Sequence, residues 1–505
     1  MAVADESYAP IPEEAEPEAV SLKLALGAVG LTLFFASLGQ TIVSTAMPVM
    51  VADLHGMSMI TWVITAYLLA STVSAPIAGK MGDLFGRKTV LQWGLAVFTA
   101  GAILCGLAQS MPMMIAGRAL QGAGAGSLIV TSMAVVADLL PPRERSRAQG
   151  VLGAAFGLST VIGPLLGGLI VEHASWHWIF FVNLPVGVAA AAIIAIALPR
   201  RTKRRPVRLD YAGAGLLATL LASVVLASNM GGSVLPWGSP AMVGLIGLAL
   251  AALVGFVLAE RRAEEPILPL ALFRNNVFVV VNAVGVLVGM GMFGTIALLP
   301  VYLQLVKGVS PTVSGMFLIP MMGGLIAASM VAGAIMSRTG RYKHMPTLST
   351  AILALALLWM SALGPDTPLW TVGVAMGAMG LGLGPVFAVG VAAIQNAVPV
   401  SMLGVGTASA NMFRLIGGSV GTAAFGAIFS GGMAHGLSGL LPAEMSANYR
   451  SLNAQMLAGL PDATRHAIGE AISASLHPVF WIAAAAALLA SAVSVALHER
   501  PLAGR

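Results

Sequence analysis

Long runs of apolar residues, each close to 20 residues in length, constrain this chain more than any other feature. Of its 505 residues, 58% are hydrophobic and 9% are charged. Soluble globular chains have about 25% charged residues, and a helix needs about 20 mainly apolar residues to cross a bilayer. The sequence therefore predicts an all-α polytopic membrane protein.

Fourteen segments meet this length requirement, which predicts 14 transmembrane helices. In chain order they are Leu22–Met50, Met59–Ala78, Thr89–Ala108, Met113–Leu139, Ala148–Val171, Trp178–Leu198, Tyr211–Asn229, Ala241–Ala259, Val277–Val306, Thr312–Met336, Met345–Leu363, Leu369–Ala393, Gly406–Phe429 and Leu476–Ala496.

Two glycine patterns occur twice, at offsets of 254 and 258 residues, which indicates duplicated halves. Gly79, Asp83, Gly86 and Arg87 correspond to Gly333, Ser337, Gly340 and Arg341, and Gly122, Gly124 and Gly126 to Gly380, Gly382 and Gly384. We therefore expect two pseudo-symmetric six-helix halves with two inserted central helices, a recurring transporter plan. The expected ranges are a disordered acidic tail at 1–21, an N-terminal half at 22–198, a basic linker and the inserted pair at 199–275, a C-terminal half at 276–498 and a tail at 499–505.

Lysine and arginine residues fall mainly on one side of this topology. With the N-terminus inside, 21 of them lie on the cytoplasmic side and 3 outside. Because positive charge favours the cytoplasmic side, the sequence predicts cytoplasmic termini in a multi-pass plasma (inner) membrane protein. The basic residues lie in short loops, so no nucleic-acid partner is expected. The segment 431–475 is then the one long external loop, expected to be solvated or to form an interfacial helix over 461–475.

Gly79–Lys88 concentrates charge between two apolar segments, with Asp83, Arg87 and Lys88 inside ten residues. These residues can form a charge cluster across two helix ends, or serve only as a topology signal with solvated charges.

Four motifs resemble the fourteen-helix drug–proton antiporter branch of the major facilitator superfamily, over about 22–497. They are Gly79–Lys88, Arg118-Ala119-Leu120-Gln121-Gly122, the stretch from Gly157 through Gly163-Pro164-Leu165-Leu166-Gly167-Gly168, and Trp176–Pro185. The resemblance implies export of amphipathic drugs or lipid-like solutes by alternating access in exchange for protons. It implies no cofactor beyond the proton gradient; membrane lipids surround the chain, and we expect a monomer.

The resemblance also assigns roles to residues. It makes Gly79, Asp83, Gly86, Arg87 and Lys88 a cytoplasmic latch. Arg118, Gln121 and Gly122 become a proton relay or a structural tie between helices. Gly157, Gly163, Pro164, Gly167 and Gly168 fit a sliding seam between the halves, or ordinary tight packing.

Other polar residues in the spans or at their ends are candidates for a substrate cavity or for proton transfer. The cavity candidates are Gln40, Ser44, Trp62, Tyr67, Gln92, Asn183, Asn282, Tyr302, Asn396 and Asn411. Glu172 and His173 are the best protonatable pair, or an exposed loop pair. Arg414 is expected to extend to the cytoplasmic interface.

One departure from the family pattern keeps a second function open. The branch usually carries an aspartate in its first helix, where this chain has Gly39. The alternative is an uncoupled facilitator or lipid-translocating protein of the same fold. A membrane-embedded enzyme would need a nucleophile, acid or metal cluster, and no such motif is visible, so we expect no enzyme.

Overall fold

The computed structural model describes residues 22–55, 59–198, 210–232, 234–437 and 461–499. Within these ranges the chain is helical, apart from turns and one isolated bridge between Gly231 and Leu235. The all-α prediction is confirmed. The tail 1–21 and most of the basic linker lie outside the described residues.

The N-terminal half contains eight helices that build six spans, since α1 with α2 and α7 with α8 each share a span. They are α1 (Leu22–Thr41), α2 (Val43–Asp53), α3 (Ile60–Phe85), α4 (Arg87–Gly106), α5 (Met111–Leu139), α6 (Pro142–His173), α7 (Trp178–Phe181) and α8 (Asn183–Ala197).

The inserted helices are α9 (Tyr211–Met230) and α10 (Pro240–Glu260), followed by the short η2 (Leu270–Arg274). The C-terminal half then contains α11 (Asn276–Val301), η3 (Tyr302–Val306), α12 (Pro311–Met316), α13 (Leu318–Thr339), α14 (His344–Met360), α15 (Leu369–Ala397), η4 (Val400–Met402), α16 (Leu403–Gly436) and α19 (Asp462–Val495).

Thirteen of the described helical segments are long and apolar enough to cross a membrane, and α14 is shorter, with 17 residues. It occupies the place of one predicted span, packed against α15 and α19. At the fourteen predicted spans, the described residues thus form thirteen long helices and one shorter helix.

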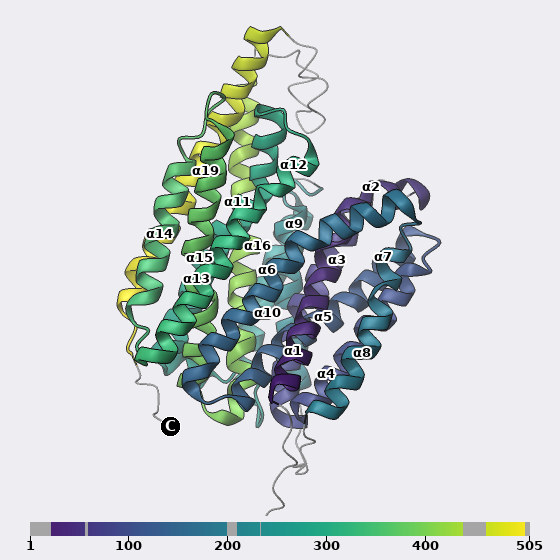
Figure 1. The fold of residues 1–505 in the computed structure, drawn as a ribbon, viewed down its shortest axis with the longest axis vertical. Helices are drawn as coiled ribbons and strands as arrows, with labels where there is room; N and C mark the ends of the chain where they lie inside the picture. Colours follow the sequence, from purple (N-terminus) through teal and green to yellow (C-terminus); the bar gives the residue numbers. More distant parts are fainter. Residues whose placement is uncertain (1–21, 56–58, 199–209, 233, 438–460, 500–505) are drawn as a thin grey trace, which may run out of the picture.

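The two halves stand side by side and approach each other closely at one end of the bundle (Figure 1). The halves contact each other mainly through α3 with α16 and α6 with α13, and also through α6 with α15 and α5 with α16. At the opposite end α2 and α7 lean away from α12 and α19 (Figure 1). We call the end that carries Asp83 and the start of α16 the latch end.

The repeated glycines occupy equivalent places in the two halves. A Cβ atom on Gly122 would lie 2.3 Å from the Tyr67 carbonyl oxygen of α3, and one on Gly124 2.4 Å from the Phe98 nitrogen of α4. In the other half, a Cβ on Gly380 would lie 2.0 Å from the Met321 oxygen of α13. One on Gly382 would lie 2.6 Å from the Leu353 nitrogen of α14. These glycines let α5 pack closely against α3 and α4, and α15 against α13 and α14. A larger side chain at any of these positions would clash with the neighbouring helix.

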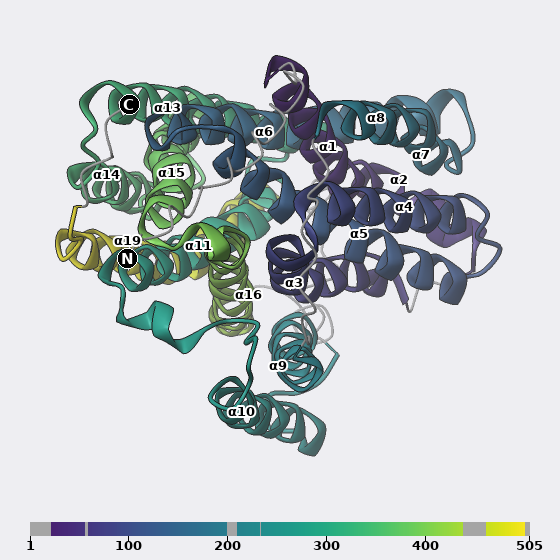
Figure 2. The same ribbon diagram turned by 90° about the horizontal axis from the view of Figure 1, so that it is seen from below.

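The inserted helices lie outside both halves, next to the boundary between α3 and α16 (Figure 2). Lys80 of α3 pairs with Glu265 beyond α10, with a 2.7 Å separation between Nζ and Oε2. The Glu260 carboxylate at the end of α10 accepts hydrogen bonds from the Ile267 and Leu268 nitrogens. The ion pair attaches the inserted segment to the latch end of the N-terminal half, and the Glu260 bonds hold the turn that follows α10.

The charged motif is more helical than the sequence indicates. Residues from Gly79 to Phe85 continue α3, and Arg87 already belongs to α4. Gly86 alone connects the two, with a φ of 91° that favours glycine over other residues. The expected loop is therefore a one-residue junction.

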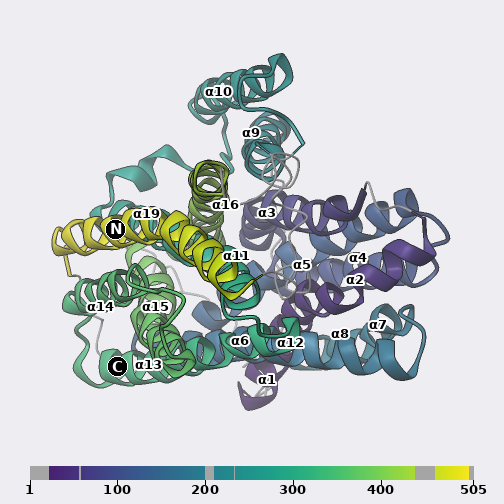
Figure 3. The same ribbon diagram turned by 90° about the horizontal axis from the view of Figure 1, so that it is seen from above.

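The external segment also differs from the solvated loop that was one of its two expected forms. The described residues of 461–475 are helical from Asp462 and continuous with α19, which then runs to Val495. Figure 1 shows this helix projecting beyond the bundle at the end opposite the latch end, and Figure 3 shows that end from above. Residues 438–460 of the segment lie outside the described residues.

Candidate functional site

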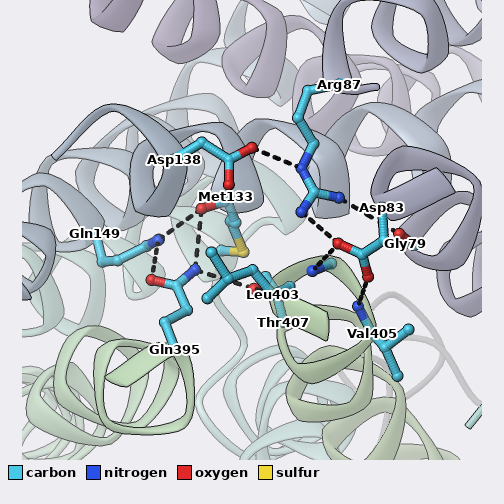
Figure 4. A network of polar contacts seen from close by, with 11 residues as sticks. Gly79, Asp83, Arg87, Met133, Asp138, Gln149, Gln395, Leu403, Val405 and Thr407 are labelled. Carbon is cyan, nitrogen blue, oxygen red and sulfur yellow. Dashed lines mark hydrogen bonds and ion pairs between the residues drawn. The ribbon is translucent and has the colours of Figure 1, made fainter. Parts of the chain in front are cut away.

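The Asp83 carboxylate joins the two halves at the latch end. Its Oδ1 accepts a 2.9 Å hydrogen bond from the Gly404 nitrogen, and its Oδ2 accepts a 2.9 Å bond from the Val405 nitrogen (Figure 4). Both nitrogens belong to the first turn of α16, whose own N-cap residue makes no side-chain bond. A helix N-terminus favours a negative charge, so Asp83 caps a helix of the opposite half.

Arg87 completes this contact from the start of α4. Its Nη2 donates to the Asp83 Oδ1 at 2.5 Å, and its Nε donates to the Asp138 Oδ2 at 2.9 Å (Figure 4). The Asp83 side chain is 2% exposed and that of Asp138 36%. The Asp83 carboxylate is thus buried and accepts hydrogen bonds from three donors, whereas the Asp138 carboxylate is partly exposed. We call Asp83, Arg87 and the Gly404 and Val405 amides the latch.

Two glycines bring the backbones together at the latch. A Cβ on Gly79 would lie 2.7 Å from the Gly404 oxygen, and one on Gly404 would lie 2.2 Å from the Gly79 oxygen. Lys88 points elsewhere and donates to the Ala195 and Leu198 oxygens of the same half.

The second copy of the motif makes the same approach without the charge. A Cβ on Gly333 would lie 2.8 Å from the Ser146 oxygen of α6. Ser337 stands in this copy where the first copy has Asp83. It lines a cavity of about 340 Å³ together with Arg147 and Arg338. The charged contact therefore belongs to one seam between the halves.

A buried amide network adds a second connection between the halves. Gln149 of α6 donates to the Met133 oxygen at 2.9 Å and to the Gln395 Oε1 at 3.3 Å (Figure 4). Gln395 of α15 donates to the same Met133 oxygen and to Thr407. Arg145 donates to the Gln395 backbone oxygen and to the Asn396 side chain.

Sequence reasoning missed most of this network. The sequence alone makes Arg145 one of the cytoplasmic loop charges and Asn396 a cavity candidate. Two glutamines at or just beyond the ends of apolar segments were the available signal, because an amide buried in a membrane helix needs a partner.

Arg118 is buried inside the N-terminal half, 1% exposed. Its Nη1 donates to the Gly39 oxygen at 2.9 Å and to the Gln121 Oε1 at 2.7 Å, and its Nε to the Val63 oxygen at 3.3 Å. The guanidinium also lies 4.2 Å from the Tyr67 ring centroid. The backbone oxygen of Gly39 thus contacts the cation at the position where the family pattern has a carboxylate.

We expect Arg118→Gln to destabilise the protein by about 3 kcal/mol, because three acceptors and a buried ring lose their donor. Thermal unfolding in a neutral detergent, compared with Arg118→Lys, measures this loss. A Gln variant of unchanged thermal stability that has lost transport would instead favour the proton relay over the structural tie.

The glycines of the antiporter-like motif do not form one seam. Cβ atoms on Gly163 and Gly167 would lie 2.2 Å from the Thr41 Oγ1 and 2.3 Å from the Ile42 oxygen, in the same half. They hold α6, which includes Pro164, against the junction of α1 and α2. Gly157 alone of the set faces the other half, toward Ile326, and Gly168 has open space beside it. The expected seam between halves is therefore wrong for Gly163 and Gly167.

The cavity candidates are dispersed rather than gathered. Tyr67 donates to the Ala36 oxygen under Arg118, and Tyr302 donates to the Gly364 oxygen near the opposite end. The Asn183 amide donates to the Ile179 and Phe180 carbonyls of α7, and the Asn282 amide donates to a carbonyl of its own helix. Gln40, Trp62 and Gln92 are partly exposed on the separate helices α1, α3 and α4, and the Ser44 side chain lies outside the described part.

Two other sequence candidates take up different positions. Glu172 and His173 are exposed at the C-terminal end of α6, with the imidazole next to the Leu169 oxygen. Arg414 does not reach the interface: its guanidinium lies 4.1 Å from the Phe387 ring centroid inside the bundle.

Two pseudo-symmetric halves that close at one end around a charged contact define a membrane transporter. The Major Facilitator Superfamily model matches residues 29–422. The chain belongs to the Major Facilitator Superfamily.

Known relatives agree with this assignment. Multidrug transporter protein MdtP of Bacillus subtilis (strain 168) is 40% identical over 402 residues, 79% of this chain and 74% of that protein. Multidrug resistance protein 3 of the same organism is 32% identical over 491 residues, 95% of this chain and 94% of that protein. The predicted multidrug efflux type is confirmed, and the chain is a transporter rather than an enzyme.

A solved structure shares the fold alone. The human organic anion transporter MFSD10 superposes with a TM-score of 0.63 at 15% identity, over 94% of this chain and 99% of that chain.

Proposed function

We propose that this chain exports amphipathic solutes across the plasma membrane by alternating access, in exchange for protons. The latch is the observation that carries the proposal. Its bonds join the end of α3 to the start of α16, so they must break whenever the halves separate at that end. The opposite end, where α2 and α7 lean away from α12 and α19 (Figure 1), then faces the side on which the substrate is released.

The orientation of export rests on the charge asymmetry of the sequence. With 21 of the 26 lysines and arginines on the latch side, that side is cytoplasmic and the open end faces outward. A state closed on the cytoplasmic side and open to the outside is the one in which an exporter releases its substrate. The multidrug names of the relatives support amphipathic solutes as the class exported.

Transport into and out of proteoliposomes tests this function. A panel of fluorescent amphipathic dyes is offered with and without an imposed pH gradient. The proposal expects dye movement that follows the gradient. Transport without any response to the gradient would support the facilitator alternative, and absence of transport for every dye would contradict export.

Gly39 is the specific observation that favours the uncoupled alternative. Among the described residues, no carboxylate pairs with Arg118, whose nearest acceptors are neutral oxygens. A carboxylate at position 39 would meet the Gln121 Nε2, which has no hydrogen-bond partner in the described part, since a Cβ there lies 3.4 Å away.

We expect Gly39→Asp to increase the dependence of transport on the pH gradient. Its Cβ would lie 2.8 Å from the Phe98 Cζ, so the variant is made in a Phe98→Leu background, with that single variant as control. Dye transport is measured at matched expression with the gradient on and off. An unchanged gradient response in the double variant would place proton coupling away from this site.

A further inference from the structure

Arg414 occupies an unusual position for a cation. It is the twelfth residue of α16, which places it about 16 Å along the helix from the latch end. That depth is near the middle of a bilayer core about 30 Å thick. A charge at this depth requires a partner or access to water, and marks a functional site by default.

The surroundings of Arg414 leave its charge uncompensated. Its Nη2 donates to the Asn411 Oδ1 at 2.5 Å, and the guanidinium lies on the ring of Phe387 from α15. Throughout the described residues, no carboxylate lies within salt-bridge distance of Arg414. Both groups that contact the guanidinium are neutral.

Arg118 and Arg414 differ in exposure and in the number of acceptors that their guanidinium groups contact. Arg118 is 1% exposed and donates to three oxygens, so its buried charge is enclosed by acceptors. Arg414 retains partial exposure, and its described contacts use one of the five N–H donors of a guanidinium. Its remaining donors are available to a group that enters from the exposed side.

The neighbouring helices hold the arginine in this position. A Cβ on Gly289 of α11 would lie 2.2 Å from the Arg414 oxygen and 3.2 Å from its Cγ, so the bare backbone accommodates the side-chain stem. On the same face of α16, a Cβ on Gly418 would lie 2.3 Å from the Phe293 ring of α11, and one on Gly421 would lie 2.7 Å from the Met290 Cγ. The guanidinium is thus a fixed cationic point with apolar surroundings.

We propose that Arg414, with Asn411 and Phe387, binds the anionic group of an amphipathic substrate, such as a carboxylate or a phosphate. A guanidinium is suited to this task because its planar donors match the oxygens of both groups. The apolar side chains then accept the hydrophobic part of the same molecule. This inference rests on the proposed export function and narrows its substrate class to anionic amphipaths.

Binding to purified protein in neutral lipid nanodiscs tests the site without requiring transport. The probes are 11-(dansylamino)undecanoate and its methyl ester, which differ only in the negative charge. We expect the wild type to bind the carboxylate at least about tenfold more tightly than the ester. Equal affinity for the two probes would overturn the proposal.

Two variants remove the charge in different ways. Arg414→Gln removes the cation, and Asn411→Asp places a carboxylate beside it, which neutralises it with the native arginine retained. Both are expected to bind the two probes equally, while Arg414→Lys retains part of the preference. Preference that survives in either charge-neutralised variant, with unchanged thermal stability, would contradict the assignment.

A transport arm distinguishes this inference from the export function. If the wild type exports the neutral ester in proteoliposomes but shows no preference for the acid, export stands and the anion site fails. If the acid binds preferentially but neither probe is transported, the anion site stands and export fails.

Discussion

Asp83→Asn is expected to reduce export at least about tenfold. The amide offers one acceptor where the carboxylate offers two, and its NH₂ group would face a backbone N–H of Gly404 or Val405. Arg87 would lose its buried counter-charge and retain Asp138. Breaking a buried pair in this way costs about 3 kcal/mol, on the order of 100-fold in the ratio of closed to open latch.

Asp138→Asn is the matched control for this prediction. Its side chain is 36% exposed and contacts the same arginine, but it makes no contact with α16 that the structure describes. Partly exposed pairs contribute about 0–1 kcal/mol, so export should stay within about twofold of the wild type. Dye efflux from cells with matched amounts of each variant in the membrane measures both. Equal efflux by Asp83→Asn and the wild type would remove the gating role and leave Gly79–Lys88 a topology signal.

Gly404→Val is expected to reduce export strongly by keeping the latch from closing. The added Cβ would lie 2.2 Å from the Gly79 oxygen and 2.4 Å from the Arg87 Nη1, where no side chain fits. Backbone atoms of α3 and α16 would have to separate, which stretches both Asp83 bonds beyond hydrogen-bonding distance. We expect a loss of at least about tenfold in efflux, comparable to that of Asp83→Asn.

Gly426→Val lies on the same helix and tests whether valine alone harms α16. A Cβ on Gly426 has no heavy atom within 4 Å, so this variant should export like the wild type. Normal export by Gly404→Val would show that close approach of the two helices is not needed. Loss of export by both variants would attribute the effect to α16 itself.

Several features of the fold were predictable because they depend on local composition. Apolar runs define the helices, and the paired glycines identify the duplicated halves, since Gly122 and Gly380 occupy equivalent contacts. The sequence indicates a break at Gly86, but it does not indicate that the residues before the break are helical. Charges near a helix end resemble a loop in sequence even when tertiary contacts keep them helical.

The partners at the site could not be predicted in the same way. Asp83 bonds to backbone nitrogens of Gly404 and Val405, and a backbone donor has no signature in the sequence. Arg414 was expected at the interface because α16 was taken to begin at Gly406. The helix begins at Leu403, and the ring of Phe387, 27 residues earlier in the chain, attracts the guanidinium inward.

The distance between spin labels across the latch end tests the central claim most directly. Glu144 of α6 and Ser401 of η4 are exposed and belong to opposite halves, so cysteines can replace both in a Cys105→Ala background. The account predicts a single short distance in the wild type and a dominant longer one in Asp83→Asn. Identical distance distributions in the two proteins would contradict it, because the latch would then not hold the halves together.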